Sequence, residues 1–261
     1  MPILPSHKLV SDNHEDIVNG LEDLHKRREQ LATQVMSRLA TNSDFSEMVK
    51  RNLAPYQRLM TYYECAMMEI ETKFRVLDAE FGLRYDRNPI ESIKTRLKGT
   101  DSLAKKLNRK GFPLSVESIE NNIFDVAGVR VVCTFPEDIF TLADALLAQD
   151  DITLVEKRDY VSNPKPSGYR SLHLIVETPI FLEKEKRLVK VEVQLRTISM
   201  NFWASLEHQL RYKKDLSEEM ASQVSDELVK LAEDAASLDN RMQALRTYLD
   251  SQSPEQLESQ N

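Results

Sequence analysis

The chain has 261 residues, 41% hydrophobic and 30% charged, a balance typical of a soluble globular protein with one sizeable domain. Its formal net charge of −7 argues against broad electrostatic attraction to nucleic acid or to an anionic membrane. No apolar run approaches the roughly 20 residues that a membrane helix needs. With only two cysteines and no segment resembling a secretory signal, we expect a reduced, cytoplasmic protein.

The first part of the chain is predicted to be helical. Apolar residues recur at helical spacing from Ile17 to Leu39, and a second helical stretch runs from about Phe45 to Phe81. Gly82 and then Asn88-Pro89 are expected to end the second stretch. Residues 1–85 therefore form a predicted N-terminal helical region with little visible chemistry.

A basic stretch follows this region. Its cations are Lys94, Arg96, Lys98, Lys105, Lys106, Arg109 and Lys110, opposed only by Asp101. Thr100-Asp101-Ser102 is predicted to cap a helix from Leu103 to Lys110, which Gly111 ends. The segment is either a solvated amphipathic helix or an anion site at a helix start. Arg96 and Lys98 point the same way if the chain before the helix is extended.

The middle of the chain predicts a sheet. Strands are expected at 128–134, 152–160, 170–177 and 187–196, with a helix from Pro136 to about Ala148 after the first. The last strand alternates strictly between apolar residues and the polar Lys190, Glu192, Gln194 and Arg196. The pattern predicts an α+β fold with a mixed or antiparallel sheet and a helical crossover.

The C-terminal part returns to helix. Met200, Trp203, Leu206 and Leu210 share one face, and Asp215 with Glu218 resembles a capping box for a further helix. That helix is predicted over 214–250, and its apolar residues recur in steps of three and four. They are Leu228, Leu231, Ala235, Leu238, Met242, Leu245 and Leu249. The repeat suits a helix–helix contact either within one subunit or between subunits. Residues 251–261 are expected to be a disordered tail.

Two carboxylates are candidate metal ligands. Asp125 precedes the strand at 128–134 and Glu192 lies between cations on the polar face of the last strand, so both could converge on one Mg²⁺ and the phosphates it binds. The alternative is that Asp125 caps a turn and that Glu192 pairs with Lys190 or Arg196 on a wet sheet face.

An aromatic ring lies on the turn Ser167-Gly168-Tyr169. Tyr169 is either a platform on which a base stacks or simply a tyrosine of a loop or core edge. His173 alternates with Ile175 and could be a half-buried histidine of the sheet. Lys157, Arg158 and Lys165 add positive charge near the same loop.

Several other site chemistries are not expected. The cysteines and the 5 histidines show no zinc-ligand spacing, and adjacent Glu207-His208 cannot both face one metal from a helix. Cys65 and Cys133 fit structural roles better than that of a nucleophile. No Gly-rich phosphate loop ending in Lys and no dinucleotide fingerprint is present.

A series of segments, taken in chain order, matches a known family. They are Arg96-Leu-Lys98, Lys106 to Lys110, Phe124 to Arg130, Arg158-Asp159-Tyr160, Ser167 to His173, Val191 to Thr197 and Asn201 to His208. On these residues the chain, over about 86–213, resembles the small alarmone synthetases, single-domain relatives of the RelA/SpoT enzymes that make (p)ppGpp. The resemblance implies a nucleotidyltransferase-like mixed sheet as the catalytic domain, with helical N- and C-terminal extensions.

The resemblance also implies a reaction and residue roles. It implies Mg²⁺-dependent transfer of pyrophosphate from ATP to the ribose 3′-OH of GDP or GTP, in stringent-response signalling. Asp125 and Glu192 match the metal-binding acids, and Glu192 matches the base that accepts the 3′-OH proton. The residues matching ATP contacts are Arg96 and Arg130 around adenine and Lys98, Lys106 and Arg109 at the phosphates. The residues matching acceptor contacts are Tyr169, stacked on guanine, with Lys165, His173, Gln194 and Arg196.

Some features depart from the family's pattern or leave alternatives open. Asn108 stands where the basic loop often carries arginine, and the N-terminal helical region exceeds what short members need. The resemblance implies a homo-oligomer, commonly a tetramer. Without a His-Asp dipeptide, alarmone hydrolysis is not expected. The competing hypotheses are a catalytically silent relative that binds nucleotides or single-stranded RNA, and a nucleotidyltransferase with another acceptor, which the purine platform of Tyr169 argues against.

Overall fold

The computed structural model describes residues 43–85, 87–212 and 217–252 and contains a five-stranded mixed sheet. The strands are β1 (Ile90–Leu97), β2 (Ala127–Cys133), β3 (Thr153–Asp159), β4 (Leu172–Phe181) and β5 (Lys186–Thr197). Their order across the sheet is β1-β2-β5-β4-β3, and only β2 and β5 run parallel to each other. The predicted α+β class with a mixed sheet is confirmed.

Helices surround this sheet on both faces. They are α2 (Leu53–Tyr85), α3 (Thr100–Lys110), α4 (Val116–Asn122), α5 (Pro136–Leu147), α6 (Ile198–Tyr212) and α7 (Glu218–Ser251), and residues 43–51 are also helical. None of the described helices is both long enough and apolar enough to cross a membrane. The predicted helix between Ile17 and Leu39 and the capping residue Asp215 lie outside the described residues.

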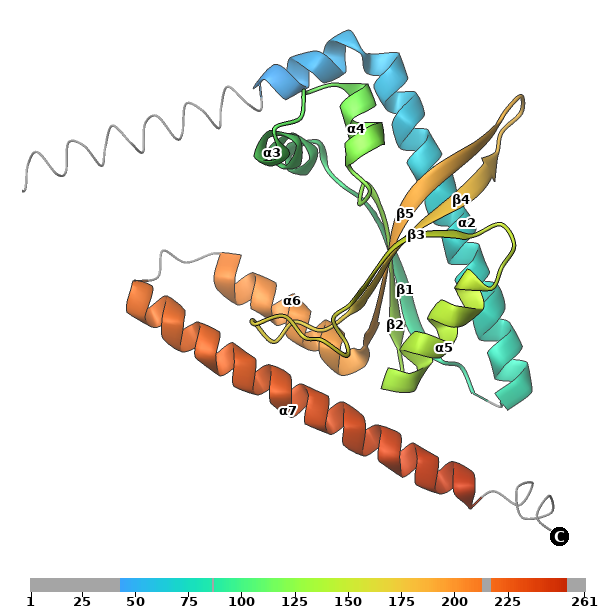
Figure 1. Cartoon of the computed structure of the whole chain (residues 1–261), viewed down its shortest axis with the longest axis vertical. Coiled ribbons are helices and arrows are strands. Elements are labelled where there is room, and N and C mark those ends of the chain that lie inside the picture. The colour runs from blue at the N-terminus through green and yellow to red at the C-terminus, as the bar shows by residue number, and fades with distance from the viewer. Residues whose placement is uncertain (1–42, 86, 213–216, 253–261) are drawn as a thin grey trace, which may run out of the picture.

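One face of the sheet is apolar and covered by α2 and α5 (Figure 1). Alternate residues of the strands, such as Val131 and Val193, are fully buried there against Ile70 and Phe74 of α2. A β-strand sends successive side chains to opposite faces, so the same alternation delivers the polar residues of β2 and β5 to the other face. The core thus forms on one side of the sheet and holds the opposite, polar side in a fixed arrangement.

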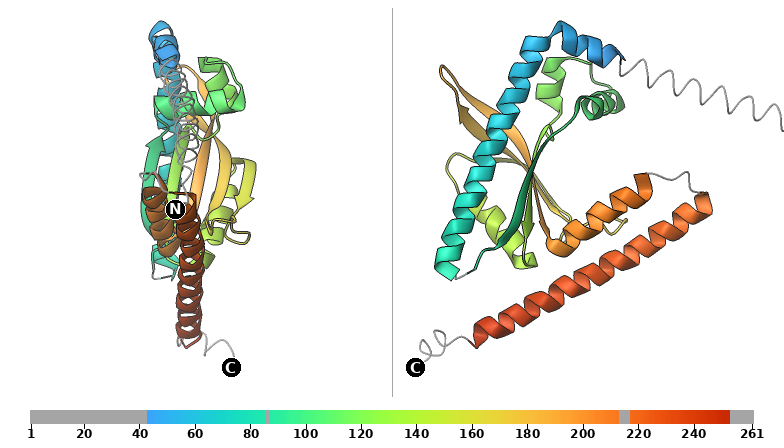
Figure 2. Two further views of the ribbon diagram at one scale, coloured as in Figure 1. Left: turned by 90° about the vertical axis from the view of Figure 1, so that its left-hand side faces the viewer. Right: turned by 180° about the vertical axis from the view of Figure 1, so that it is seen from behind.

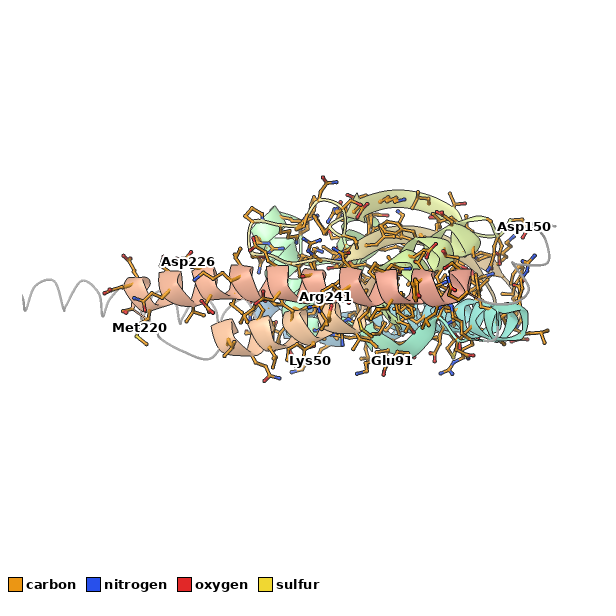
Figure 3. The ribbon with its side chains drawn as sticks, turned by 90° about the horizontal axis from the view of Figure 1, so that it is seen from below. Lys50, Glu91, Asp150, Met220, Asp226 and Arg241 are labelled. Atoms are coloured by element: carbon orange, nitrogen blue, oxygen red, sulfur yellow. The ribbon has the colours of Figure 1, made fainter. Side chains whose placement is uncertain are left out.

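The polar face is flanked at its two ends (Figures 1 and 2). Helices α3 and α4 gather at one end, and α6 with α7 at the other. Figure 3 shows α7 running along α6, from Met220 past Asp226 to Arg241. Two helix pairs from different parts of the chain thus border the polar face.

Three local predictions need correction. The segment of β1 was not predicted as a strand: Ile90, Ile93 and Leu97 are spaced as on a helix, and pairing with β2 overrides that preference. Helix α3 has Gly99 at its N-cap with no side-chain hydrogen bond, so the predicted cap from Thr100-Asp101-Ser102 is wrong. Helix α2 passes through Gly82 and ends at Tyr85.

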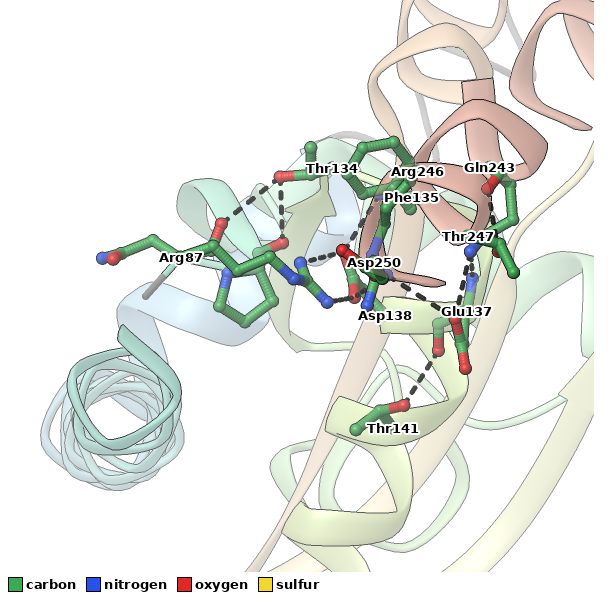
Figure 4. A network of polar contacts seen from close by, with 12 residues as sticks. Arg87, Thr134, Phe135, Glu137, Asp138, Thr141, Gln243, Arg246, Thr247 and Asp250 are labelled. Carbon is green, nitrogen blue, oxygen red and sulfur yellow. Dashed lines mark hydrogen bonds and ion pairs between the residues drawn. The ribbon is translucent and has the colours of Figure 1, made fainter. Parts of the chain in front are cut away.

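The C-terminal half of α7 is attached to the start of α5 through charged side chains (Figure 4). The Asp138 carboxylate, 2% exposed, accepts two hydrogen bonds from Arg87, at 2.6 and 3.0 Å. Arg246 of α7 lies 3.4 Å from the same carboxylate and also pairs with Glu137 and Asp250. One buried carboxylate therefore joins the segment before β1, the start of α5 and α7.

Replacing Asp138 by Ala is expected to lower the free energy of unfolding by about 3–5 kcal/mol, because the substitution leaves the guanidinium groups of Arg87 and Arg246 without their shared carboxylate. Thermal denaturation measures the effect. Asp144→Ala is the matched control, since Asp144 is an exposed carboxylate on the same helix and its loss should change stability by less than about 0.5 kcal/mol. Equal melting temperatures for the two variants would contradict the structural role of Asp138.

Candidate functional site

The strand pairing brings the polar residues of neighbouring strands side by side. In the parallel pair, Glu192 of β5 lies beside Gly128 of β2, and Gln194 lies beside Arg130. On the other side of β5, His173 of β4 is the partner of Gln194. Residues far apart in the sequence thus meet on one face, and Gly128 presents no side chain between Glu192 and the strand β1 beyond.

A cavity of about 540 Å³ opens on this face between β1 and β5. Its lining contains both predicted metal ligands, Asp125 and Glu192, and the predicted ATP residues Arg96, Lys98 and Arg130. The remaining lining residues are Lys94, Thr95, Gly128, Val129 and Gln194. The structure therefore gathers acidic and basic side chains, predicted from separate parts of the chain, around one space.

Asp125 is held by two lysines at the edge of the cavity. Its Oδ2 atom lies 2.9 Å from Nζ of Lys98 and 2.7 Å from Nζ of Lys106, and both ammonium groups are mostly buried. Burial alone would raise the pKa of Asp125, but the hydrogen bonds from Lys106 and Lys98 outweigh it and hold the pKa below its ordinary value. Asp125 therefore stays ionised. The alternative interpretation, that Asp125 caps a turn, is not observed.

The other carboxylate oxygen of Asp125 is buried and has no hydrogen-bond partner among the described residues. A buried polar atom of this kind usually has a partner, so the lack of one points to a ligand. No group of three or more His, Cys, Asp or Glu side chains able to hold a metal occurs in the described ranges. Two carboxylates fit Mg²⁺ nonetheless, since Mg²⁺ commonly takes one or two of them and completes its shell with phosphates and water.

Glu192 makes two side-chain contacts of its own. Its Oε1 atom lies 3.4 Å from Nδ1 of His173, and its Oε2 atom accepts a hydrogen bond of 2.8 Å from Gln194. Burial and the charge of Asp125 raise the pKa of Glu192, whereas the contacts with His173 and Gln194 lower it, and the net shift is downward. The alternative pairing of Glu192 with Lys190 or Arg196 is not observed.

Lys190 and Arg196 have other partners on the same face. The Lys190 ammonium lies 4.2 Å from the ring centroid of Phe124. Arg196 is 5% exposed and donates hydrogen bonds to Tyr169 and Gln194.

Arg130, half-buried in the cavity wall, has an Nε atom without a hydrogen-bond partner in the part of the chain that the structure describes. Burial and the neighbouring cations Arg196 and Arg96 lower the pKa of Arg130.

Tyr169 lies beside the cavity rather than in its lining. Its backbone carbonyl accepts a hydrogen bond from the backbone N–H of Lys165. Gly168 forms the turn between them with a φ of +87°, a backbone angle that residues with a side chain rarely adopt. A Cβ atom on Gly168 would lie 2.5 Å from Cβ of Ala232 in α7. Tyr169 packs against the small cluster of Trp203, Leu228 and Ala232, so α6 and α7 support its turn.

Three of the predicted acceptor residues, Lys165, His173 and Arg196, contact the Tyr169 ring, whereas the predicted ATP residue Arg109 lies apart. The Lys165 ammonium is 4.9 Å from the ring centroid and the Arg196 guanidinium carbon 5.1 Å from it. His173 and Tyr160 meet the same ring edge to face. Arg109, exposed near the end of α3, does not line the cavity.

Sequence reasoning did not assign a role to Tyr160 or to the cluster of α6 and α7 that supports Tyr169. Tyr160 belongs to the Arg158-Asp159-Tyr160 motif, so a signal was present in the sequence. Leu228 belongs to the regular repeat of α7 and Ala232 lies one turn further along the helix, outside that repeat. Only the tertiary contact with Gly168 and Tyr169 distinguishes them from ordinary helix-packing residues.

Comparison with known proteins matches the segment that contains most of these site residues to a protein-family model. Residues 95–217 match the profile described as "Region found in RelA / SpoT proteins". GTP pyrophosphokinase YwaC of Bacillus subtilis is 39% identical over 202 residues, which are 77% of this chain and 95% of the relative. GTP pyrophosphokinase YjbM of the same organism is 36% identical over 192 residues, covering 73% of this chain and 88% of the relative.

Solved structures agree with the sequence matches. The small alarmone synthetase 2 of Bacillus subtilis superposes with a TM-score of 0.63 at 40% identity, covering 71% of this chain and 96% of the other. The small alarmone synthetase 1 of the same organism, bound to its product pppGpp, gives a TM-score of 0.64 at 35% identity, covering 76% and 96%. Sequence and fold thus match the same group of proteins.

Proposed function

Because this chain belongs to the small alarmone synthetases of the RelA/SpoT family, we propose that it transfers pyrophosphate from ATP to the ribose 3′-OH of GDP or GTP. The observation that carries the proposal is the cavity that Asp125 and Glu192 line together with Arg96, Lys98 and Arg130. A catalytically silent relative is not favoured, because its fold would not need two carboxylates gathered with three cations around one cavity.

In the proposed reaction the 3′-oxygen of the acceptor attacks the β-phosphorus of ATP. The new bond joins this oxygen to the β-phosphorus, the bridge between the α- and β-phosphates breaks, and AMP leaves with the bridging oxygen. Glu192 accepts the 3′-OH proton, for which its position in the cavity and its ionised carboxylate suit it. The products are AMP and the acceptor with a 3′-pyrophosphate.

The cavity supplies charge for this transfer, which positioning and electrostatics usually dominate. Asp125 and Glu192 would hold Mg²⁺, and the bound ion would neutralise part of the phosphate charge. Arg96 and Arg130 lie on neighbouring strands of the same face, where their planar groups can enclose adenine. Lys98 and Lys106 are paired with Asp125, and we propose that they bind ATP phosphates, as does Arg109 of α3, which lies outside the cavity lining.

The acceptor is proposed to bind beside this cavity, over Tyr169. Guanine stacks on the phenol ring, and the Lys165 ammonium next to the ring lies where a phosphate of GDP or GTP can reach it. Glu192 lies between the two substrate positions, since it lines the cavity and also contacts His173. His173, Gln194 and Arg196 therefore belong to the acceptor side of the site.

Incubation of the protein with ATP, Mg²⁺ and each of GMP, GDP and GTP, followed by separation of the products, tests the proposal directly. AMP and a guanine nucleotide carrying a 3′-pyrophosphate are expected together, in equal amounts and only when Mg²⁺ is present. Release of AMP without a pyrophosphorylated guanine nucleotide would indicate another acceptor. No turnover of ATP under any of these conditions would favour a nucleotide- or RNA-binding protein.

Replacing Tyr169 by Ala is expected to raise KM for the guanine nucleotide by roughly 5- to 100-fold, because base stacking contributes about 1–3 kcal/mol. KM for ATP should change by less than about twofold, since Tyr169 lies outside the cavity proposed for ATP. Steady-state kinetics with each substrate varied in turn measures both constants. Equal increases for the two nucleotides would contradict the stacking role.

We also propose that subunits associate through α7. The apolar repeat of this helix is largely exposed in the single chain, with exposures of 47% for Leu231, 53% for Leu238, 50% for Met242, 58% for Leu245 and 65% for Leu249. Alternating steps of four and three residues place these side chains along one seam, as in a coiled coil. A homo-oligomer, a tetramer if a second contact surface exists, would cover the seam. We further propose a cytoplasmic location, the compartment expected from the sequence.

A further inference from the structure

Arg196 is a buried cation whose hydrogen-bond partners are all neutral. It is 5% exposed, and its Nη2 atom donates to the Tyr169 hydroxyl at 2.5 Å and to the Gln194 side-chain oxygen at 3.0 Å. Its Nε atom lies 3.4 Å from the Ser171 hydroxyl. A buried guanidinium requires acceptors, and these neighbours provide them without neutralising its charge. One nitrogen of Arg196 is thus the start of two separate paths of hydrogen bonds.

The first path passes through the proposed purine platform. The Tyr169 oxygen accepts from Arg196, so the hydroxyl proton is free to be donated to Nε2 of His173, which lies 2.8 Å away. A histidine whose Nε2 accepts carries its proton on Nδ1. That nitrogen lies 3.4 Å from Oε1 of Glu192. In this arrangement Arg196 donates to Tyr169 and Tyr169 donates to His173, while Nδ1 of His173 faces the carboxylate at 3.4 Å.

The second path is shorter and ends on the other oxygen of the same carboxylate. Gln194 accepts from Arg196 through its side-chain oxygen, which leaves its amide nitrogen to donate to Oε2 of Glu192 at 2.8 Å. The two paths together form a closed ring of polar contacts, four hydrogen bonds and the 3.4 Å contact between His173 and Glu192, that begins at Arg196 and reaches both oxygens of Glu192. A fully satisfied network of this kind fixes the orientation of its members.

We propose that Arg196 is a positioning residue which, through Tyr169, His173 and Gln194, holds Glu192 in the orientation that accepts the 3′-OH proton. The inference rests on the proposed function, because it takes Glu192 as the base. It assigns the Tyr169 hydroxyl a role separate from that of the ring: the ring binds guanine, and the hydroxyl links the bound purine to the base. Platform and base then act as one unit.

The substitution Tyr169→Phe separates these roles, because it keeps the ring and removes the hydroxyl. The expected result is a kcat about 10-fold lower, since a small misplacement of a reacting group is costly, with KM for GTP unchanged within about twofold. Tyr160→Phe is the matched control. Its ring also packs against Tyr169 and His173, but its hydroxyl is not part of the ring of polar contacts, so kcat should not change.

A raised KM for GTP with unchanged kcat in Tyr169→Phe would overturn the inference, because the hydroxyl would then serve acceptor binding. Unchanged kinetics would overturn it as well. Melting temperatures of the variants, measured beside the wild type, show whether a loss of kcat comes from unfolding.

A double-mutant cycle tests whether the residues act as a unit. His173→Asn shortens the side chain, which can no longer reach both Tyr169 and Glu192. Tyr169→Phe is expected to lower kcat about 10-fold when introduced into the wild type. If the path runs through His173, the same substitution introduced into His173→Asn should lower kcat by less than about twofold. Losses of kcat that multiply in the double variant would show independent residues and reject the path.

The histidine itself offers a readout that does not depend on activity. Side-chain ¹⁵N NMR of His173 should show the tautomer protonated on Nδ1 in the wild type and a change of its ¹⁵N shifts in Tyr169→Phe. A proton on Nε2 of the neutral ring in the wild type would overturn the path. A wild-type protein that transfers no pyrophosphate would refute the proposed function, and the NMR measurement would still decide whether the hydrogen-bonded path exists.

Discussion

Replacing Glu192 by Gln is expected to lower kcat for pyrophosphate transfer by about 10³-fold or more, because the change removes a general base worth about 10²–10⁴-fold together with a proposed metal ligand. The amide has nearly the same shape, but only its oxygen can accept, so one of the two neighbours His173 and Gln194 loses its acceptor. Single-turnover assays with saturating ATP and GTP measure the loss.

A matched control for this substitution lies on the neighbouring strand. Glu177 of β4 pairs across the sheet with Lys190, two positions along β5 from Glu192, and does not line the cavity. Glu177→Gln removes the same charge from the same sheet and should retain kcat within about twofold. Normal turnover by Glu192→Gln would remove Glu192 from the mechanism, whatever the control does.

Replacing Asp125 by Asn is expected to lower kcat/KM for ATP by about 10²- to 10³-fold, since a metal that neutralises phosphate charge contributes several kcal/mol. Two effects combine in this variant. The buried oxygen that lacks a partner would no longer belong to a carboxylate, so Mg²⁺ would bind more weakly. Lys98 and Lys106 would also lose the carboxylate that orders their ammonium groups.

The dependence of the rate on Mg²⁺ concentration separates these effects. A ligand role predicts that Asp125→Asn needs far more Mg²⁺ for half-maximal rate, whereas a role only in ordering the lysines predicts a raised KM for ATP at unchanged Mg²⁺ demand. Asp101→Asn provides the comparison, because Asp101 is an exposed carboxylate at the start of α3 in the same basic segment. Its kinetics should match those of the wild type.

Helix α7 contacts both the start of α5, as Figure 4 shows, and the turn that carries Tyr169. Its C-terminal half is attached to α5 through Arg246 and Asp138, and its middle supports the Tyr169 turn at Gly168 through Ala232. The exposed apolar seam lies on this same helix. Contacts made by α7 with another subunit would therefore reach the acceptor platform through a single rigid element.

Much of the fold followed from local pattern. The alternation of Val189 to Arg196 predicted β5 with its buried and polar faces, and the structure confirms both. Helix α5 begins at the predicted Pro136, and α3 ends at the predicted Gly111. These signals are local because they depend on the two-residue period of a strand and on residues that start or stop helices.

The strand β1 and the helix α4 did not follow from the sequence. The apolar residues of β1 are spaced as on a helix, and only the ladder with β2 makes this segment a strand. The seven-residue α4 starts at Ser115, whose hydroxyl accepts a hydrogen bond from Ser118, a signal too short to be recognised without its surroundings. Both elements depend on partners distant in the chain.

By itself the sequence determined the chemical inventory of this protein: two acids, a set of cations and an aromatic turn, in the order of a recognisable family. Only the tertiary structure decided the partners of each group, placing Lys98 and Lys106 on Asp125 and joining Arg196 to Glu192 by two paths. The physical reason is that an ionisable side chain takes its charge state and direction from atoms within a few ångströms, and here those atoms come from strands that the chain order separates.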